Sequence, residues 1–183
     1  MTGKTLLVTR ECEALLIPHG YTITLVEGSA VRITQALGDN FTLEVQGNLV
    51  LVMGEDRDAL GMPPLTEQDH PTLHDDSVGL KEKCDYQMRR CYDPEIPVNI
   101  VELGLIYDCQ LREFEHDANK QAAHVTMTLT APTCGMGPVL VEEVKRKVMQ
   151  LNDIGQVEVE LVFDPPWSQE MMSDAARLQL GLL

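Results

Sequence analysis

The residue best placed to do chemistry is Cys134, which stands in the segment Thr-Ala-Pro-Thr-Cys-Gly-Met-Gly-Pro of residues 130–138. A helix is predicted directly after it, so the thiol faces unpaired backbone N–H groups and the positive end of that helix. Both favour the thiolate, the form that attacks electrophiles and binds soft metals. Gly135 and Gly137 leave room for a partner or cofactor to approach the backbone. The alternative interpretation is a buried structural cysteine in a tight turn.

Two elements are predicted to hold Cys134 in place. Residues 124–130 alternate between apolar and polar types, which is typical of a half-buried strand. Residues 138–151 repeat valine and leucine at helical spacing after Pro138, a favoured first helical residue. Acidic residues come first in this segment and basic residues follow, as the helix dipole prefers. The cysteine is therefore expected in a strand-to-helix connection.

The chain has five cysteines, an odd number, and none of them forms a C-x-x-C pair. This argues against a disulfide framework and against a zinc or four-thiolate cluster site made by one chain alone. A soft-metal site would need further ligands from a second subunit, a partner or a small thiol. Cys84 and Cys91 share one stripe of a helix predicted over 80–92, and Cys109 shares a strand face with leucines over 105–111. These three thiols are expected in a core.

Composition limits the classes of partner. The 183 residues are 44% hydrophobic, enough for a core, and carry a net charge of −15. That charge disfavours nucleic acid and anionic membrane surfaces as partners. Apolar runs are too short for a membrane span, and the first residues lack a signal-peptide pattern, so we expect a cytoplasmic protein.

Two regions are predicted before the second unit. Residues 1–53 have the pattern of a small all-β unit, because short apolar or alternating runs are separated by glycine-containing turns. Residues 54–79 are rich in acidic residues and proline and are predicted to be a flexible linker. His70 and His74 lie there at helical spacing, but Pro71 would break the helix needed to pair them on a metal. The predicted strands of the β unit cover residues 22–26, 31–34, 41–45 and 49–52.

Residues 80–183 are predicted to form the second unit. Its elements follow in the order helix, strand, strand, helix, strand, helix; the third strand covers 157–163, and Ser168 caps a last helix that runs to Leu180. This order predicts helices packed against a mixed three-stranded sheet. The fold class is therefore α+β: a small β-rich N-terminal unit followed by an α/β domain.

A second candidate segment lies between the first helix and the first strand of this unit. Pro94 and Pro97 stiffen it and fix where Asp93, Glu95 and Asn99 point. A rigid loop with three polar side chains suits presentation of groups at a surface. The alternative is that the Asp93 or Asn99 side chain caps a helix locally.

The two segments together resemble a known family. Asp-Pro-Glu-Ile-Pro-Val-Asn over 93–99, Leu-Gly-Leu-Ile-Tyr over 103–107, the segment around Cys134 and Asp-Pro-Pro-Trp over 164–167 are similar to the metal-sulfur cluster biosynthesis domain. PaaD-type proteins and the cytosolic iron–sulfur targeting factors of eukaryotes share that domain. The segments 10–20 and 31–38 resemble the N-terminal extension of the bacterial SufT branch.

The resemblance implies an accessory role in iron–sulfur protein maturation without a classical active site. Cys134, between Thr133 and Gly135, takes the family's reactive-cysteine position, and the loop from Asp93 to Asn99 is expected beside it. Gly135 is a departure, because many members have proline there, so the thiol direction of those members does not carry over. The resemblance does not choose between cluster transfer, cluster carriage and client adaptation.

Three functional hypotheses follow. In the first, Cys134 gives one thiolate to a labile iron–sulfur cluster or iron that is delivered to client apoproteins, with assembly proteins or a homodimer supplying other ligands. In the second, the protein is a metal-free adaptor that docks clients to the assembly machinery. In the third, Cys134 is an enzymatic nucleophile, with His124 or His116 as base and Glu95 as orienting acid.

Overall fold

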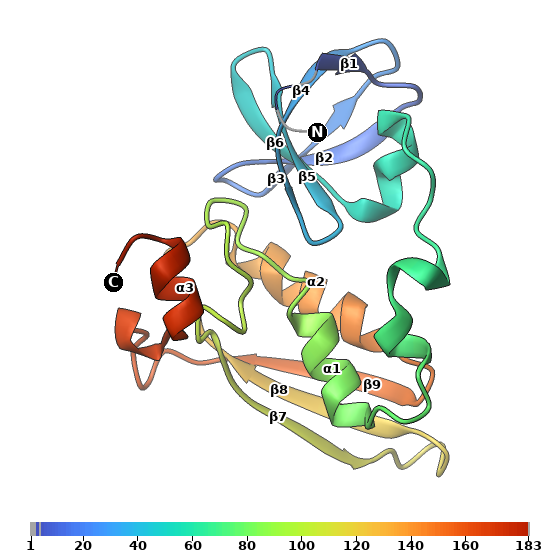
Figure 1. Ribbon diagram of the computed structural model, residues 1–183, viewed down its shortest axis with the longest axis vertical. Helices are drawn as coiled ribbons and strands as arrows, with labels where there is room; N and C mark the ends of the chain where they lie inside the picture. Colours follow the sequence, from blue (N-terminus) through green and yellow to red (C-terminus); the bar gives the residue numbers. More distant parts are fainter. Residues whose placement is uncertain (1–2, 4, 183) are drawn as a thin grey trace. The chain divides into compact units, whose positions relative to one another are not determined.

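The computed structural model of the protein describes residue 3 and residues 5–182, apart from the side chain of Glu67 (Figure 1). The chain forms two compact units, the first ending at Asp69 and the second beginning at His70. Its class is α+β, as predicted: one sheet is all antiparallel and the other is mixed and packed with helices.

The first unit is a six-stranded antiparallel sheet in the order β1-β4-β5-β6-β2-β3. The four predicted strands are present, and β1 and β2 are two that the sequence patterns missed. Gln46 and Gly47 both have positive φ and close the β5–β6 hairpin, and Asn48 already belongs to β6. The strands are β1 (Thr5–Leu7), β2 (Cys12–Leu16), β3 (Tyr21–Leu25), β4 (Ala30–Leu37), β5 (Asn40–Val45) and β6 (Asn48–Val52).

The structure corrects the expected start of the linker. The 3₁₀ helix η1 (Gly54–Leu60) belongs to the first unit, because Ala59, Leu60 and Met62 are buried in that unit's core. Arg10 holds the helix from outside, donating to the carboxylates of two of its aspartates at 2.6–2.8 Å. The segment is acidic overall, so its composition did not reveal the three apolar residues that anchor it to the core of the first unit.

The end of the expected linker belongs to the second unit. The 3₁₀ helix η3 (Pro71–His74) contacts α1 (Leu80–Met88), and Leu73 packs on the core there. The ring of His70 lies 3.3 Å from the Tyr86 hydroxyl, Nδ1 to Oη. Exposed connector is left mainly between Gly61 and His70, where η2 (Glu67–Asp69) is a single short turn.

The second unit carries the mixed sheet β7-β8-β9, with α1 and α2 on one of its faces (Figure 1). Strands β7 and β8 are antiparallel, whereas β8 and β9 are parallel and joined through α2. Helix α1 stops at Met88 rather than at residue 92, and the last helix is capped by Ser173 instead of Ser168. The remaining elements are β7 (Ile106–Glu113), β8 (Gln121–Met127), α2 (Gly137–Met149), β9 (Ile154–Leu161), η4 (Gln169–Met171) and α3 (Asp174–Gln179).

A buried ion pair lies within the helical layer. Glu143 and Lys147 are one turn apart on α2, each 2% exposed, and Lys147 Nζ is 3.1 Å from Glu143 Oε1. The same ammonium donates to the backbone carbonyl of Arg90 at 2.6 Å, just beyond the end of α1. One lysine therefore satisfies a buried carboxylate and a carbonyl at the end of the neighbouring helix.

Candidate functional site

Three loops leave the β7-β8-β9 sheet from the same end. Because β7 runs antiparallel to β8, Ile106 at the start of β7 pairs with Met127 at the end of β8. Because β9 runs parallel to β8, Leu161 at the end of β9 pairs with Met127 as well. The segments before β7, after β8 and after β9 therefore meet there, and they cover residues 92–105, 128–136 and 162–168.

Backbone hydrogen bonds continue the sheet into these loops. Thr128 N donates to Leu105 O at 2.8 Å, and Val162 N donates to Met127 O at 2.8 Å. The residue of each loop that adjoins the sheet is thus held by hydrogen bonds that continue the ladder of the strands. Each loop therefore joins the sheet at a fixed position.

The loop 92–105 is closed at its base and shaped by its own side chains. Tyr92 and Asn99 form an antiparallel bridge. Asp93 is buried and its Oδ1 accepts from the N–H of Glu95 at 3.0 Å. Asn99 Oδ1 accepts from two backbone N–H groups, at 3.1 and 2.9 Å, in the next turn. These local bonds match the capping alternative for both residues, whereas Glu95 is exposed.

The loop after β9 supports the loop before β7. The indole of Trp167 donates to Leu103 O at 2.8 Å, and the hydroxyl of Tyr107 donates to Pro165 O at 2.8 Å. Gly104 has φ +72°, and a side chain there would collide with the carbonyl oxygen of Met171. Only glycine satisfies both conditions at this position, so Gly104 lets the loop 92–105 pack backbone to backbone against the end of η4.

Cys134 lies at the junction of two successive turns. Its N–H donates to Ala131 O at 3.2 Å, and its carbonyl accepts from Gly137 N at 3.1 Å, where α2 begins. Thr133 and Gly135 on either side are exposed, and the Cys134 side chain is partly buried against the core. The predicted strand-to-helix connection is confirmed, and the helix starts one residue earlier than expected.

The five thiols differ in exposure. Cys134 is partly exposed, whereas Cys12, Cys84, Cys91 and Cys109 are buried. The predicted core positions of Cys84, Cys91 and Cys109 are confirmed. Burial raises the pKa of the Cys12 thiol. Of the five cysteines, only Cys134 is a partly exposed residue, and it lies in an exposed loop.

Two of the buried thiols lie on elements that pack together in one core, Cys84 on α1 and Cys109 on β7. Hydrogen bonding with Cys109, together with burial, raises the pKa of Cys84, and the same interaction lowers the pKa of Cys109. Amphipathic patterns placed both residues on covered faces but could not tell which residue of the other element each would meet.

The loop 92–105 and the Cys134 loop pack on one core. Ile96 and Val101 from the first loop and Cys134 from the second contact the same buried cluster. The shared core and the shared sheet end place Asp93–Asn99 and Cys134 in one region of the unit. A direct contact between that loop and the sulfur stays a prediction.

The histidines of the nucleophile hypothesis lie elsewhere. His116 is in the β7–β8 connection, at the opposite end of the sheet from Cys134. His124 lies on the sheet face away from the core, with its ring nitrogens 3.5 and 3.4 Å from the carboxylates of Glu158 and Glu160. The topology therefore does not assemble the thiol triad drawn from the sequence.

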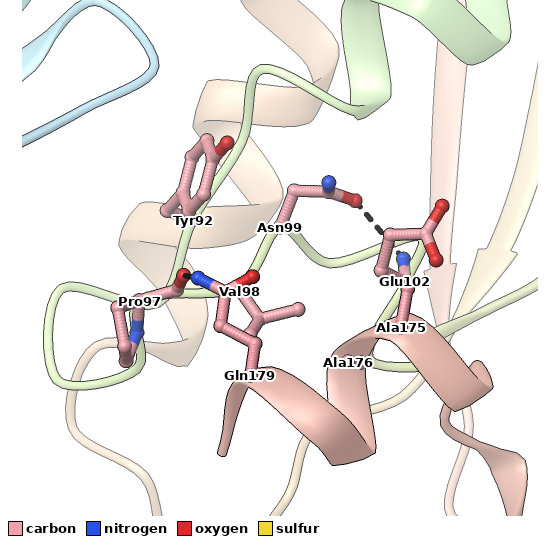
Figure 2. Close-up of a pocket in the computed structure, with 8 residues that line it drawn as sticks. All are labelled: Tyr92, Pro97, Val98, Asn99, Glu102, Ala175, Ala176 and Gln179. Atoms are coloured by element: carbon pink, nitrogen blue, oxygen red, sulfur yellow. Dashed lines mark hydrogen bonds between the residues drawn. The ribbon is translucent and has the colours of Figure 1, made fainter.

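A small pocket of about 100 Å³ opens beside the loop 92–105, against α3 (Figure 2). Gln179 of α3 closes one side by donating to Pro97 O at 2.6 Å. Glu102 is fixed by hydrogen bonds from Ser173 and Arg89, which lower the pKa of its carboxyl group. No sequence motif pointed to Glu102 or Gln179. The lining residues are Tyr92, Pro97, Val98, Asn99, Glu102, Ala175, Ala176 and Gln179.

A complete metal site is absent from the part of the chain that the structure describes, where no three His, Cys, Asp or Glu side chains are grouped to hold an ion. His70 and His74 likewise belong to no such group. Cys134 can offer one thiolate, so any iron or cluster bound there would share its other ligands with another molecule. Among the described residues, every helix is too short or too polar to cross a membrane.

Comparison with known proteins assigns the chain to a family. The family model described as iron-sulfur cluster assembly protein matches residues 87–161. An Fe-S protein maturation auxiliary factor of Porphyromonas gingivalis is 37% identical over 111 residues, which are 100% of that protein and 61% of this chain. The chain belongs to the iron–sulfur cluster assembly protein family. The resemblance drawn from the motifs is thus confirmed.

This family member is of the SufT type. It is 37% identical over 90 residues to the Fe-S protein maturation auxiliary factor SufT of Staphylococcus aureus, covering 96% of that protein and 49% of this chain. A crystal structure of a domain of unknown function, DUF59, from Bacillus anthracis matches with a TM-score of 0.50 and 35% identity, covering 57% of this chain and 93% of that one.

The match includes both candidate loops. The family model lies wholly within the second unit and contains Asp93–Asn99 and Cys134. The resemblance of the first unit to a SufT-branch extension rests on its own motifs and stays a prediction.

Proposed function

We propose that this SufT-type protein is a non-enzymatic accessory factor in iron–sulfur protein maturation, in which Cys134 contributes a thiolate to iron or a cluster in transit to an apoprotein. The observation that carries the proposal is that Cys134, alone among the five cysteines, is partly exposed, in an exposed loop of the family-matched unit. Relatives named as Fe-S protein maturation auxiliary factors support the role.

Binding through a single protein thiolate is weak enough for the iron or cluster to be released again. A two-iron cluster generally takes four thiolate or equivalent ligands, so three would come from a second copy, an assembly protein, a client or a small thiol. Each of these can be exchanged for a ligand of the receiving apoprotein. Iron and the cluster are therefore substrates of the protein, and its partners are assembly proteins and client apoproteins.

Anaerobic loading tests the role of Cys134. Wild type, Cys134→Ala and Cys12→Ala are incubated with iron, sulfide and a small thiol, and cluster absorbance is read after desalting. Cys12 is buried in the other unit, so its variant is the matched control. We expect absorbance in wild type and Cys12→Ala and its loss in Cys134→Ala. Equal absorbance in all three would remove Cys134 as a ligand.

The second candidate is a metal-free adaptor, favoured by apolar side chains at the same end of the sheet. Leu161, Phe163 and Met171 are 36–41% exposed in and after β9. Such side chains can bury area against a client without any metal. Equal client capture by the metal-free protein and Cys134→Ala would support the adaptor. Capture that requires iron and Cys134 would support delivery.

A further inference from the structure

Strand β9 leaves one edge of the mixed sheet open. We propose that this edge binds an extended, basic segment of another protein, which adds to the sheet as a further strand beside β9. In that segment lysine or arginine alternates with apolar residues. The site uses residues other than Cys134, and binding there does not depend on whether that thiol carries iron.

The backbone of β9 is the first observation. This strand is the last in the order β7-β8-β9 and pairs only with β8 (Figure 1). Val162 N donates to Met127 O in the β8 ladder, and the backbone groups of alternate residues point to opposite edges of a strand. The N–H and C=O groups of Val157, Val159 and Leu161 therefore point away from β8. Within the described part of the chain no hydrogen bond reaches them, so an extended chain can pair with them.

The opposite edge of the sheet is protected by its own side chains. The Cys109 N–H of β7 donates to the Asp108 carboxylate at 2.8 Å. The Gln110 amide donates to the same carboxylate at 2.6 Å, and the Arg112 guanidinium donates to the Gln110 side chain at 2.7 Å. These bonds hold polar side chains along β7 and occupy one of its edge donors. Strand addition is therefore favoured at β9 and not at β7.

Side chains on the two faces of β9 select the kind of segment. Glu158 and Glu160 lie on the face away from the helices, and their side chains are 63% and 58% exposed. On the other face Val157 and Val159 are half-buried, and Leu161 is 36% exposed. A strand beside β9 would meet carboxylates on one face and aliphatic groups on the other. Alternating basic and apolar residues satisfy both faces.

Charge also decides between a basic partner and a second copy of this chain. Between Lys147 and Arg177 the sequence has six acidic residues and no lysine or arginine. Antiparallel pairing of two β9 strands would place glutamates against glutamates, which is unfavourable. The same carboxylates attract lysine and arginine on a partner strand. The edge therefore disfavours a twin and favours a basic segment.

The direction of β9 gives the binding a consequence. Leu161 at the end of β9 pairs with Met127 at the end of β8, and the Cys134 loop follows β8. One end of the added strand would therefore lie at the end of the sheet from which the three loops leave. A protein bound through this segment would be held on that side of the unit.

Peptide binding to the metal-free full chain tests the proposal. The probe is a fluorescein-labelled peptide, Lys-Val-Lys-Val-Lys-Val-Lys, and the control peptide has glutamate in place of every lysine. Fluorescence anisotropy is measured at about pH 8, where ordinary imidazole groups are neutral. We expect saturable binding of the basic peptide and no binding of the acidic one.

Charge variants test the role of the two carboxylates. Glu158→Lys combined with Glu160→Lys should weaken binding about tenfold, because two exposed ion pairs are lost. Glu113→Lys combined with Glu115→Lys is the matched control, since it changes the net charge equally at the opposite end of the sheet. That control should have a much smaller effect, because distant surface charges are screened.

Amide hydrogen exchange followed by NMR locates the peptide. The N–H groups of Val157, Val159 and Leu161 should exchange more slowly in the complex, because they gain acceptors. Those of Glu158 and Glu160 point toward β8 and should change little. Leu161→Pro removes an edge donor but no bond to β8, so it should weaken binding with the circular dichroism spectrum retained. Leu161→Ala keeps the donor and separates its effect from that of the side chain.

Four results would overturn the proposal. They are the absence of saturable binding of the basic peptide, equal binding of the two peptides, binding that leaves the three edge amides unprotected, and self-association of the metal-free protein through β9. The exchange measurement on the unsubstituted protein decides the matter if Leu161→Pro does not fold. None of these results bears on iron loading at Cys134, which is tested separately.

Discussion

Cys134 differs from the other four thiols in what surrounds its sulfur. Its neighbours Thr133 and Gly135 are exposed, and its own backbone groups are used in two turns. The buried thiols are enclosed by apolar side chains of two separate cores. Access to reagent, rather than the number of cysteines, should therefore decide which thiol reacts.

Site-resolved alkylation tests this order. At limiting iodoacetamide we expect Cys134 to be labelled first in the folded protein, and Cys12 and Cys84, whose burial or hydrogen bonding raises the thiol pKa, to react only on unfolding. The labelled peptides are quantified by mass spectrometry. Labelling of Cys12 or Cys91 before Cys134 would contradict the assignment.

Gly104 allows a second test with single residues. Gly104→Ala should lower the free energy of unfolding by roughly 1–3 kcal/mol, since the new side chain meets the Met171 carbonyl and the residue has a left-handed conformation. Gly79→Ala is the matched control, because its Cβ would meet open space and its φ is −66°. Urea titration of both variants measures the difference, and equal stabilities would remove the close approach as a constraint.

At this scale the sequence indicated which cysteine lies in an exposed loop but not how every polar residue is used. Turn-forming residues before a helical pattern were sufficient to place Cys134. Asp93 and Asn99 were open to two interpretations, because the same oxygens can cap local turns or face a partner, and the structure uses them locally. Which core residues of β7 lie opposite Cys84 depends on the position of α1 along the strand, which periodicity does not determine.

Helix α2 is joined to the end of α1 by a buried ion pair on α2. Lys147 meets both the Glu143 carboxylate and the Arg90 carbonyl beyond α1. Removing the cation alone takes a positive charge away from a buried carboxylate, which is costly, whereas removing both charges is much less so.

This asymmetry predicts the outcome of a short mutant series. Lys147→Met should destabilise the protein by about 3–5 kcal/mol, and adding Glu143→Gln should recover part of the loss. Lys145→Met is the control, because its ion pair with Glu142 is well exposed, and it should change stability by less than about 0.5 kcal/mol. The series is read by urea denaturation. A double variant no more stable than Lys147→Met would show that lost packing, and not the uncompensated charge, causes the loss of stability.

Elements were predicted well where apolar periodicity was continuous. The second unit's three strands and α2 follow the sequence patterns closely. Strands β1 and β2 and the helix η1 were missed, because short or charge-flanked segments give weak periodicity. Ala59 and Leu60 are held by tertiary packing in the core of the first unit. The overall composition of residues 54–79, which is acidic and rich in proline, did not indicate this packing.

The whole molecule consists of two units, and the exposed connection between them should be the site of proteolysis. Limited digestion should cut between Gly61 and His70 and leave two resistant fragments, because η1 is packed in one unit and η3 in the other. Mass spectrometry of the fragments locates the cut. Early cleavage between Gly54 and Leu60 would contradict the packing of η1.

The assembly state should depend on iron. The edge strand β9 carries Glu158 and Glu160, and antiparallel pairing with the β9 of a second copy would bring the glutamates of the two copies together. At the other edge, the backbone N–H of Cys109 in β7 already donates to the Asp108 side chain at 2.8 Å. Pairing of sheet edges is therefore disfavoured, and a dimer should form through shared cargo at Cys134.

Light scattering coupled to size exclusion tests this dependence. We expect a monomer without metal, a dimer after anaerobic iron and sulfide loading, and a monomer again for Cys134→Ala. A metal-free dimer, or a loaded dimer that survives Cys134→Ala, would contradict a cluster-bridged assembly. A monomer in every state would leave a partner-completed site or the adaptor.

The common origin of the three loops leaves the other end of the sheet free for engineering. Residues 114–120 join β7 to β8 there, and Ala118 and Asn119 are exposed at the tip of the hairpin. Insertion between them meets few buried groups. A peptide epitope or fluorophore in this turn would give an immobilisation handle or optical reporter remote from the Cys134 loop, so that client capture could be followed with that loop unmodified.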